Sequence, residues 1–292
     1  MLTHLHAKPI LPTRVVILGA GGFVSSAAQR RLEALNVPVL ALTQYMLDLT
    51  HQNAGIQLAS LLHPDDTLVF VAAKAPVKSE AMLIENLIMC QTVCEALKKI
   101  PVNHVVYISS DAVYANSDSP LTEFSCAQPD SLHGVMHLAR EVMLSNACQG
   151  SLCFLRPTLI YGKDDPHNGY GPNRFLRLAM NGEDIMLFGE GEERRDHVYI
   201  EDVAEIIRLV ILHRSSGILN IASGVVTSFK EIAEMIFSKF NSPTIIKNIP
   251  RKGLMPHGGY KPFNNANCQK AFPEFQFTSL EKGLEKSYNC LK

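Results

Sequence analysis

Two histidines, His133 and His137, are the residues whose type and spacing most directly suggest chemistry. Residues four apart lie on one face of a helix, so both imidazoles would project in the same direction. An imidazole titrates near neutral pH and can exchange a proton with a substrate. The same spacing suits zinc, but Gly134 stands where an HExxH motif has its glutamate. Asp165 or His167 would have to supply a third ligand, and we predict no metal site.

A glycine-rich turn near the N-terminus suggests a phosphate-binding site. The apolar run Val15–Leu18 ends in a cluster with glycine at 19, 21 and 22, and an amphipathic stretch follows at once. Glycine permits positive φ and lets a pyrophosphate approach the backbone closely. The free N–H groups at the start of the next helix attract the phosphates. This order of strand, turn and helix predicts a nicotinamide-dinucleotide site.

The elements that would position these residues alternate along the first half of the chain. Apolar runs typical of strands alternate with stretches whose apolar residues recur at helical spacing. We predict strands at 15–18, 37–42, 68–73, 104–109 and 152–155, and helices at 23–35, 81–98 and 133–147. The alternation predicts an α/β fold with a Rossmann-like, doubly wound parallel sheet. Ligands of such a sheet bind at the carboxyl ends of its strands, where Ser110 would lie.

The second half of the chain has a different texture. A loop rich in glycine, proline, aspartate and asparagine spans 162–173, and short elements follow it. Ser228 with Glu231, and Thr278 with Glu281, have the spacing of capping boxes that begin helices. We therefore expect a dinucleotide-binding domain at 1–161. A smaller C-terminal lobe at 162–292 would mainly bind substrate, with some segments returning to the main domain.

The composition excludes several classes of protein. The 292 residues carry a net charge of −1 and the pI is near 6.8, so no overall field favours nucleic acid or anionic membrane. No apolar run approaches the roughly 18 residues that a membrane span needs, and the first residues do not form a signal peptide. The seven cysteines lack metal-type spacing, which indicates reduced thiols. We expect a cytoplasmic protein with no nucleic-acid partner and no membrane partner.

Two longer motifs point to a known family. The segment from Tyr107 to Tyr114 has the form Ser-Ser-x-x-Val-Tyr, and the segment from Arg195 to Val203 has the form Arg-Asp-x-x-Tyr-x-x-Asp-Val. With the glycine turn, they make the chain resemble the extended short-chain dehydrogenases/reductases over nearly its whole length. That group comprises nucleotide-sugar epimerases, dehydratases and reductases. The resemblance implies an NAD or NADP cofactor and a nucleotide-sugar substrate.

The resemblance also implies a set of site residues. Cofactor contacts would come from Gly19, Gly22, Phe23, Val24, Asp48, Leu49, Ala72, Ala73, Lys74, Asn86, Ser109, His137 and Pro157. Substrate contacts would come from Tyr114, Asn173, Arg174 and Arg195, with the last on the diphosphate. The catalytic residues would be Ser110, Asp111, His133 and His137. The segment Thr43-Gln44-Tyr45 offers neither an acid nor an arginine, so the choice between NAD and NADP stays open.

The chain departs from the family at several of these positions. The family's catalytic tyrosine and lysine align with His133 and His137. Its dehydratases use an Asp-Glu pair, but here Asp111 is followed by Ala112, which disfavours dehydration and leaves Asp111 either catalytic or a turn former. Leu159 stands where many relatives carry a substrate-binding asparagine. Ser25 replaces the third glycine of the turn, which suggests slightly looser packing of helix on strand.

Two functions therefore stay open. In the first, the chain is an NAD(P)-dependent oxidoreductase or epimerase of a nucleotide-linked keto-sugar. Ser110 would stabilise the substrate oxygen and His133 would transfer the proton, with activity changing near pH 6 to 7, about the imidazole pKa. In the second, catalysis is lost and the chain binds a dinucleotide or a sugar nucleotide. The resemblance further implies a homodimer formed through the helices at 81–98 and 133–147.

Overall fold

Seven strands form the main sheet of the structure, a computed structural model that describes residues 2–240 and 244–291. Six strands are parallel and the short edge strand β1 is antiparallel. In spatial order they are β1 (Thr3–His4), β10 (Ser215–Ile221), β6 (Ser151–Pro157), β5 (His104–Ile108), β4 (Thr67–Phe70), β2 (Val15–Leu18) and β3 (Val39–Leu42). The central strands β2, β4 and β5 are buried throughout and mostly apolar, because both faces of the sheet are covered.

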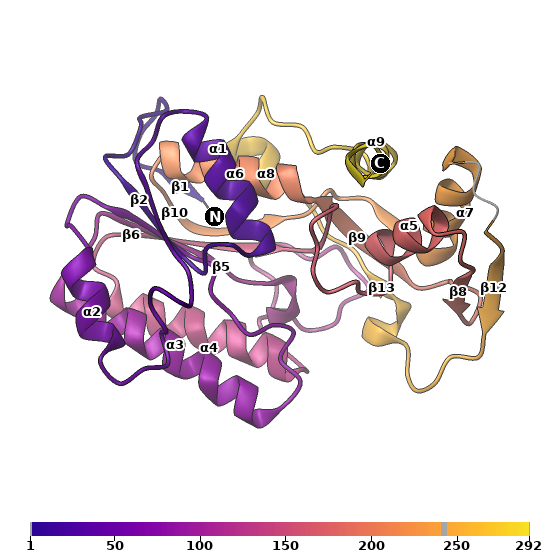
Figure 1. Cartoon of the computed structure of the whole chain (residues 1–292), viewed down its shortest axis with the longest axis horizontal. Coiled ribbons are helices and arrows are strands. Elements are labelled where there is room, and N and C mark those ends of the chain that lie inside the picture. Colours follow the sequence, from indigo (N-terminus) through magenta and orange to yellow (C-terminus); the bar gives the residue numbers. More distant parts are fainter. Residues whose placement is uncertain (1, 241–243, 292) are drawn as a thin grey trace.

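Helices cover both faces of this sheet, as Figure 1 shows. One face carries α2 (Ala54–Leu61), α3 (Glu80–Lys99) and α4 (Leu132–Ala147). The other face carries α1 (Phe23–Glu33), α6 (Ile200–Leu212) and α8 (Ala266–Ala271). The expected α/β fold with a doubly wound parallel sheet is confirmed.

The predicted strands and helices occur with small shifts at their ends. The strand expected at 68–73 ends at Phe70, so residues 71–73 form a loop at the carboxyl edge of the sheet. Two elements from beyond residue 161 lie in this part of the molecule. Strand β10 pairs with β6, and α6 packs against α1. The division of the chain at residue 161 itself stays a prediction.

A second group of elements lies beyond the carboxyl edge of the main sheet (Figure 1). One small sheet contains β7 (Leu159–Tyr161), β9 (Arg194–Tyr199), β11 (Val226–Ser228) and β13 (Tyr260–Lys261). A second contains β8 (Ile185–Phe188) and β12 (Ile246–Ile249). The helices of this group are α5 (Pro172–Met180), α7 (Phe229–Phe240) and α9 (Leu280–Leu291). Their apolar faces meet in a core of their own, which includes Phe175, Leu187 and Phe229.

One of the two predicted capping boxes forms. At the start of α7, Ser228 Oγ accepts from the backbone N–H of Glu231 at 3.1 Å, and the Glu231 carboxylate accepts from the Ser228 N–H at 2.7 Å. The box predicted at Thr278 is wrong, because Asp202 accepts both the N–H and the hydroxyl of Thr278. Ser279 caps α9 in its place.

Two further sequence expectations have a structural counterpart. All seven cysteines lie within the described residues and are free thiols. None of the helices described is long and apolar enough to span a bilayer.

Candidate functional site

A cavity of about 1090 Å³ lies at the carboxyl ends of the main-sheet strands. Segments that follow β2, β4, β5 and β6 bound it, together with the start of α4 and parts of the second group of elements. The predicted site residues on its wall are Gly19, Gly22, Phe23, Val24, Asp48, Leu49, Ala72, Ala73, Lys74, Ser109, Ser110, Asp111, His133, His137, Pro157 and Arg195. Parallel topology therefore gathers most of the predicted site in one place.

The glycine turn between β2 and α1 leaves room for a phosphate group. Gly19 has φ +88° and approaches the loop after β4 so closely that a Cβ would lie 2.7 Å from the Ala72 backbone. Gly21 has φ +84° and faces open space. Ser25 is fully buried, and its Oγ donates to the Gly19 carbonyl at 2.7 Å and accepts from the Gly22 N–H at 3.0 Å. This serine fastens the turn to α1 instead of loosening the packing as expected.

A fully buried arginine anchors the loop that faces this turn. Arg140 on α4 donates to the Ala72 carbonyl at 2.8 Å and to the Asn86 carbonyl at 2.7 and 2.9 Å. Asn86 does not line the cavity, but its side chain holds the backbone N–H and carbonyl of Lys74, each at 3.0 Å. Asn86 thus shapes, from behind, the part of the cavity wall that Lys74 forms. Among the described residues, no carboxylate pairs with Arg140.

A buried ion pair fixes the end of β5. Glu141 accepts from the hydroxyl of Ser109 at 2.6 Å and pairs with the Arg156 guanidinium through contacts of 2.5 and 2.9 Å. All three side chains are buried. Glu141 is therefore tied to the positioning of Ser109 and does not face the cavity.

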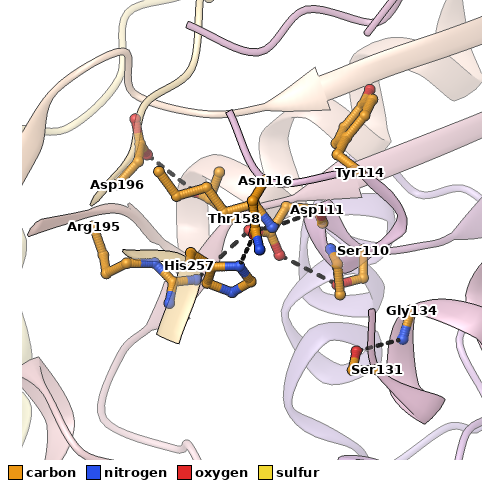
Figure 2. Close-up of polar contacts among 12 residues, drawn as sticks. Ser110, Asp111, Tyr114, Asn116, Ser131, Gly134, Thr158, Arg195, Asp196 and His257 are labelled. Carbon is orange, nitrogen blue, oxygen red and sulfur yellow. Dashed lines mark hydrogen bonds and ion pairs between the residues drawn. The ribbon is translucent and has the colours of Figure 1, made fainter. Parts of the chain in front are cut away.

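Ser110 and Asp111 follow β5 at the other end of the cavity (Figure 2). Asp111 begins the one-turn helix η1 (Asp111–Val113), and Ser110 caps this turn by accepting the Ala112 N–H at 3.1 Å. The Ser110 hydroxyl donates to Asp111 Oδ1 at 3.3 Å. Arg195 of β9 lies 3.8 Å from Asp111 Oδ2 and 3.5 Å from Glu193. The predicted phosphate-binding arginine thus faces the predicted catalytic pair.

The two histidines of α4 lie on the cavity wall with their rings edge to face, 4.7 Å between centroids. Nδ1 of His137 lies 2.8 Å from the hydroxyl of Tyr107, and Nδ1 of His133 accepts a long contact of 3.5 Å from the Val77 N–H. Burial lowers the pKa of His133, and the charge of Arg140 lowers it further, against the opposing effect of Asp111. Burial also lowers the pKa of His137, well below its ordinary range. Both imidazoles are therefore neutral at neutral pH.

Helix α4 can approach Ser110 closely only because residue 134 is glycine. A Cβ on Gly134 would lie 2.0 Å from the carbonyl oxygen of Ala112 and 2.7 Å from Pro129. The N–H of Gly134 donates to the capping hydroxyl of Ser131 at 3.2 Å (Figure 2). The contact sets how far His133 stands from the turn that carries Ser110.

The zinc interpretation of the two histidines lacks its third ligand. In the part of the chain that the structure describes, His133 and His137 gather no third metal ligand. Asp165 instead accepts from the Asn173 amide at 2.8 Å and from the His167 N–H at 3.1 Å. The grouped ligands His63, Asp65 and Asp66 lie elsewhere, and Asp66 there pairs with Arg14.

Three residues predicted to contact substrate lie off the cavity wall. Tyr114 is buried and donates to Asn220 Oδ1 at 2.7 Å, with the guanidinium of Arg156 over its ring. Asn173 accepts from the Gly162 N–H at 2.8 Å and so ties α5 to the loop before it. Arg174 is exposed on the first turn of α5.

Residues that sequence reasoning missed complete the far end of the cavity. His257 of the short helix η2 (Pro256–Gly259) lines the wall, and its Nδ1 donates to Asn116 at 2.6 Å. Lys261 of β13 is buried and bonds to Asp111. No local signal marks either residue, because β13 reaches η1 only through its pairing with β9.

Comparisons with known proteins agree with this architecture. A UDP-N-acetyl-alpha-D-glucosaminuronate decarboxylase of Bacillus cytotoxicus is 26% identical over 314 residues, covering 94% of this chain and 96% of that protein. A putative UDP-glucose 4-epimerase of Methanocaldococcus jannaschii is 27% identical, over 71% of this chain and 69% of that protein. The solved UDP-glucose 4-epimerase of Thermotoga maritima has the same fold, with a TM-score of 0.84 at 19% identity over 95% and 98% of the two chains.

A family model covers most of the cavity-forming part of the sequence. The model described as the NAD dependent epimerase/dehydratase family matches residues 15–222. This range contains the glycine turn, Ser110, both histidines of α4 and Arg195. The chain therefore belongs to the NAD-dependent epimerase/dehydratase family.

Proposed function

We propose that this protein transfers a hydride between a nicotinamide cofactor and a carbon of a nucleotide-linked sugar, giving keto reduction or epimerisation. The observation that carries the proposal is the shared cavity: the glycine turn, Ser110, His133 and Arg195 all line it. A phosphate-binding turn, an oxygen-stabilising hydroxyl, a proton-transferring group and a diphosphate-binding cation are the parts that this reaction needs. Relatives named as UDP-sugar enzymes support the substrate class.

The residues present fit a dinucleotide cofactor. Gly21 leaves open space at the N-terminus of α1, and Phe23 and Val24 line the cavity at the first turn of that helix. Free N–H groups at such a helix start bind phosphate. Asp48 and Leu49 would meet the adenine end, while Ala73, Ser109 and Pro157 would flank the nicotinamide end. When bound, the nicotinamide supplies the hydride donor or acceptor.

The chain's own residues would then handle the sugar oxygen and its proton. The Ser110 hydroxyl, which donates to Asp111 Oδ1 in this structure, would turn to donate to the oxygen on which charge develops. During oxidation of the sugar hydroxyl, neutral His133 would accept the hydroxyl proton; during reduction of the keto group, the imidazolium form would return that proton to the oxygen. His137 would hold the ribose and orient His133. Arg195 would bind the diphosphate with its guanidinium fork. Residues 162–292 would mainly hold the nucleotide sugar, with Tyr114, Asn173 and Arg174 acting from behind the wall or at its entrance.

Titration of the protein with NADH and NADPH, followed by cofactor fluorescence, tests the proposal first. Saturable binding of either form supports it and resolves the cofactor, because Gln44 at the end of β3 offers no charge that selects between them. Binding followed by turnover of a keto-sugar nucleotide would establish the reaction. Absence of binding would overturn the proposal, and binding without turnover of any sugar nucleotide would favour a binding protein on the same fold.

We further propose a cytoplasmic homodimer joined through α3 and α4. These helices pack against each other, and each exposes apolar side chains: Ile84 and Ile88 on α3, and Val135 and Val142 on α4. Such a patch is typical of an interface between copies. Light scattering of the purified protein should give twice the chain mass, and Ile88→Glu should return it to the monomer mass.

A further inference from the structure

A buried lysine from the second group of elements contacts the turn η1, which carries Asp111. Lys261 lies on β13, opposite Arg195 in the parallel pairing with β9. Its side chain is 1% exposed, and its Nζ donates to the main-chain carbonyl of Asp111 at 2.9 Å. The same Nζ lies 3.3 Å from Asp111 Oδ2. One ammonium group therefore holds both the backbone and the carboxylate of this residue.

The surroundings of Asp111 favour its charged form. Oδ1 accepts from Ser110, while Oδ2 faces Lys261 and, at 3.8 Å, Arg195. His257 of η2, shown in Figure 2, lines the cavity near it, and His133 of α4 lines the same cavity. Burial alone would raise the pKa of Asp111, but the charges of Lys261 and Arg195 outweigh burial and hold that pKa below its ordinary value. Burying an ammonium without such a partner would be costly, so each ion requires the other.

This arrangement limits what Asp111 can do. Elimination of water from a sugar requires a group that protonates the departing hydroxyl. A carboxylate that stays ionised has no proton to give, and it can only accept hydrogen bonds. Asp111 lies on the cavity wall beside Ser110, where a substrate sugar would meet it.

We propose that Lys261 is a positioning residue that fixes Asp111 as a permanent hydrogen-bond acceptor for a hydroxyl or amino group of the sugar. The proposal deepens the proposed function and rests on it for the identity of the ligand. The favoured substrates are nucleotide sugars that present such a donor beside the reacting carbon. Lys261 thereby confines the site to hydride transfer without loss of water.

Carboxyl-carbon NMR of aspartate-labelled protein tests the ionisation directly, with the Asp111 signal assigned by Asp111→Asn. We expect Asp111 to stay ionised from pH 5 upward in the unaltered protein. Lys261→Met should raise its midpoint by at least one pH unit, Lys261→Arg should restore it, and Lys252→Met, on the exposed loop nearby, should leave it unchanged. An Asp111 that is protonated at pH 6, or that titrates identically in Lys261→Met, would overturn the proposal. The measurement on the unaltered protein stands even where Lys261→Met does not fold.

Steady-state kinetics with a nucleotide sugar tests the role in binding. Without Lys261, the Asp111 carbonyl and Oδ2 lose the ammonium group that holds them from this side, so the hydrogen bond from Asp111 to the sugar should be misaligned. KM should rise about tenfold in Lys261→Met, with kcat and NADH affinity little changed and with rescue by Lys261→Arg. Mass analysis of the product should show no loss of water, and a dehydrated product would contradict the proposal. If the unaltered protein turns over no nucleotide sugar, the proposed function fails, while the NMR titration still decides the role of Lys261.

Discussion

His137 lies 2.8 Å from the hydroxyl of Tyr107 through its Nδ1, deep in the wall of the cavity. One turn further along α4, the buried guanidinium of Arg140 contacts carbonyl groups, a thioether and the face of the Phe70 ring, and no carboxylate among the described residues pairs with it. The charge of Arg140 adds to burial in lowering the pKa of His137. A neutral residue at position 137 is therefore compatible with Arg140 in a way that a lysine would not be.

Replacing His137 with lysine should destabilise the protein. A second cation beside Arg140 would lack a counter-ion, and an unpaired buried charge costs several kcal/mol. We expect His137→Lys to lower the free energy of unfolding by about 3 kcal/mol in urea denaturation. The double variant His137→Lys/Arg140→Met should recover part of that loss. A single variant as stable as the original protein would contradict this reading of Arg140.

His133 should carry the proton transfer. His133→Phe keeps the ring volume but removes the proton acceptor, so kcat should fall by about 100-fold or more. NADH affinity should remain, since the glycine turn is untouched. His63→Phe, a change at an exposed histidine, is the matched control and should leave kcat unchanged. Unchanged turnover in His133→Phe would exclude this residue as the proton-transferring group.

The pH at which activity falls on the acid side should be lower than the pH 6 to 7 expected from the sequence. Burial and Arg140 lower the pKa of His133, so the neutral, active imidazole persists to lower pH than a free imidazole does. For oxidation of the sugar hydroxyl, in which His133 accepts the proton, activity should be constant above pH 7 and should fall with a midpoint below pH 6.5, the ordinary imidazole value. Initial rates from pH 5 to pH 8 measure this. A midpoint at or above 6.5 would show that another group governs this fall in activity.

Replacing Arg195 should weaken nucleotide-sugar binding without weakening dinucleotide binding. If Arg195 binds the diphosphate as proposed, Arg195→Ala removes a charged donor, and nucleotide-sugar affinity should fall by about 10- to 100-fold. Dinucleotide affinity should not change, because the glycine turn lies at the other end of the site. Arg194→Ala is the control, since Arg194 is the exposed neighbour on the same strand. Equal losses of both ligands in Arg195→Ala would contradict the separation.

The sequence predicts most of the fold because its signals are local. The apolar run at Val15–Leu18, the glycine turn and the helical spacing that follows each depend on neighbours in the chain. Parallel topology then brings Gly19, Ser110 and His133 to one edge of the sheet without further information. The membership in an NAD-dependent family follows from the same motifs.

The contacts that the sequence does not predict are made between residues that lie far apart in the chain. Asp111 and Lys261 are 150 residues apart and meet only because β13 lies beside β9. Thr278 has the spacing of a helix cap, yet Asp202, 76 residues earlier, takes both of its donors. Tyr114 belongs to a matching motif but packs away from the cavity, since Asn220 of β10 accepts its hydroxyl. Tertiary partners, not local propensity, determine the contacts that these residues make.

The absence of a side chain at Gly134 restricts which residue this fold can accept at that position. Because a single added carbon there would collide with the Ala112 carbonyl, even alanine must push α4 away from η1. His133 would then move away from the turn that carries Ser110. A glutamate at this position, as in an HExxH motif, would meet the same collision. The lack of space at Gly134, as well as the chemistry of the two histidines, therefore disfavours an HExxH metal centre on this helix.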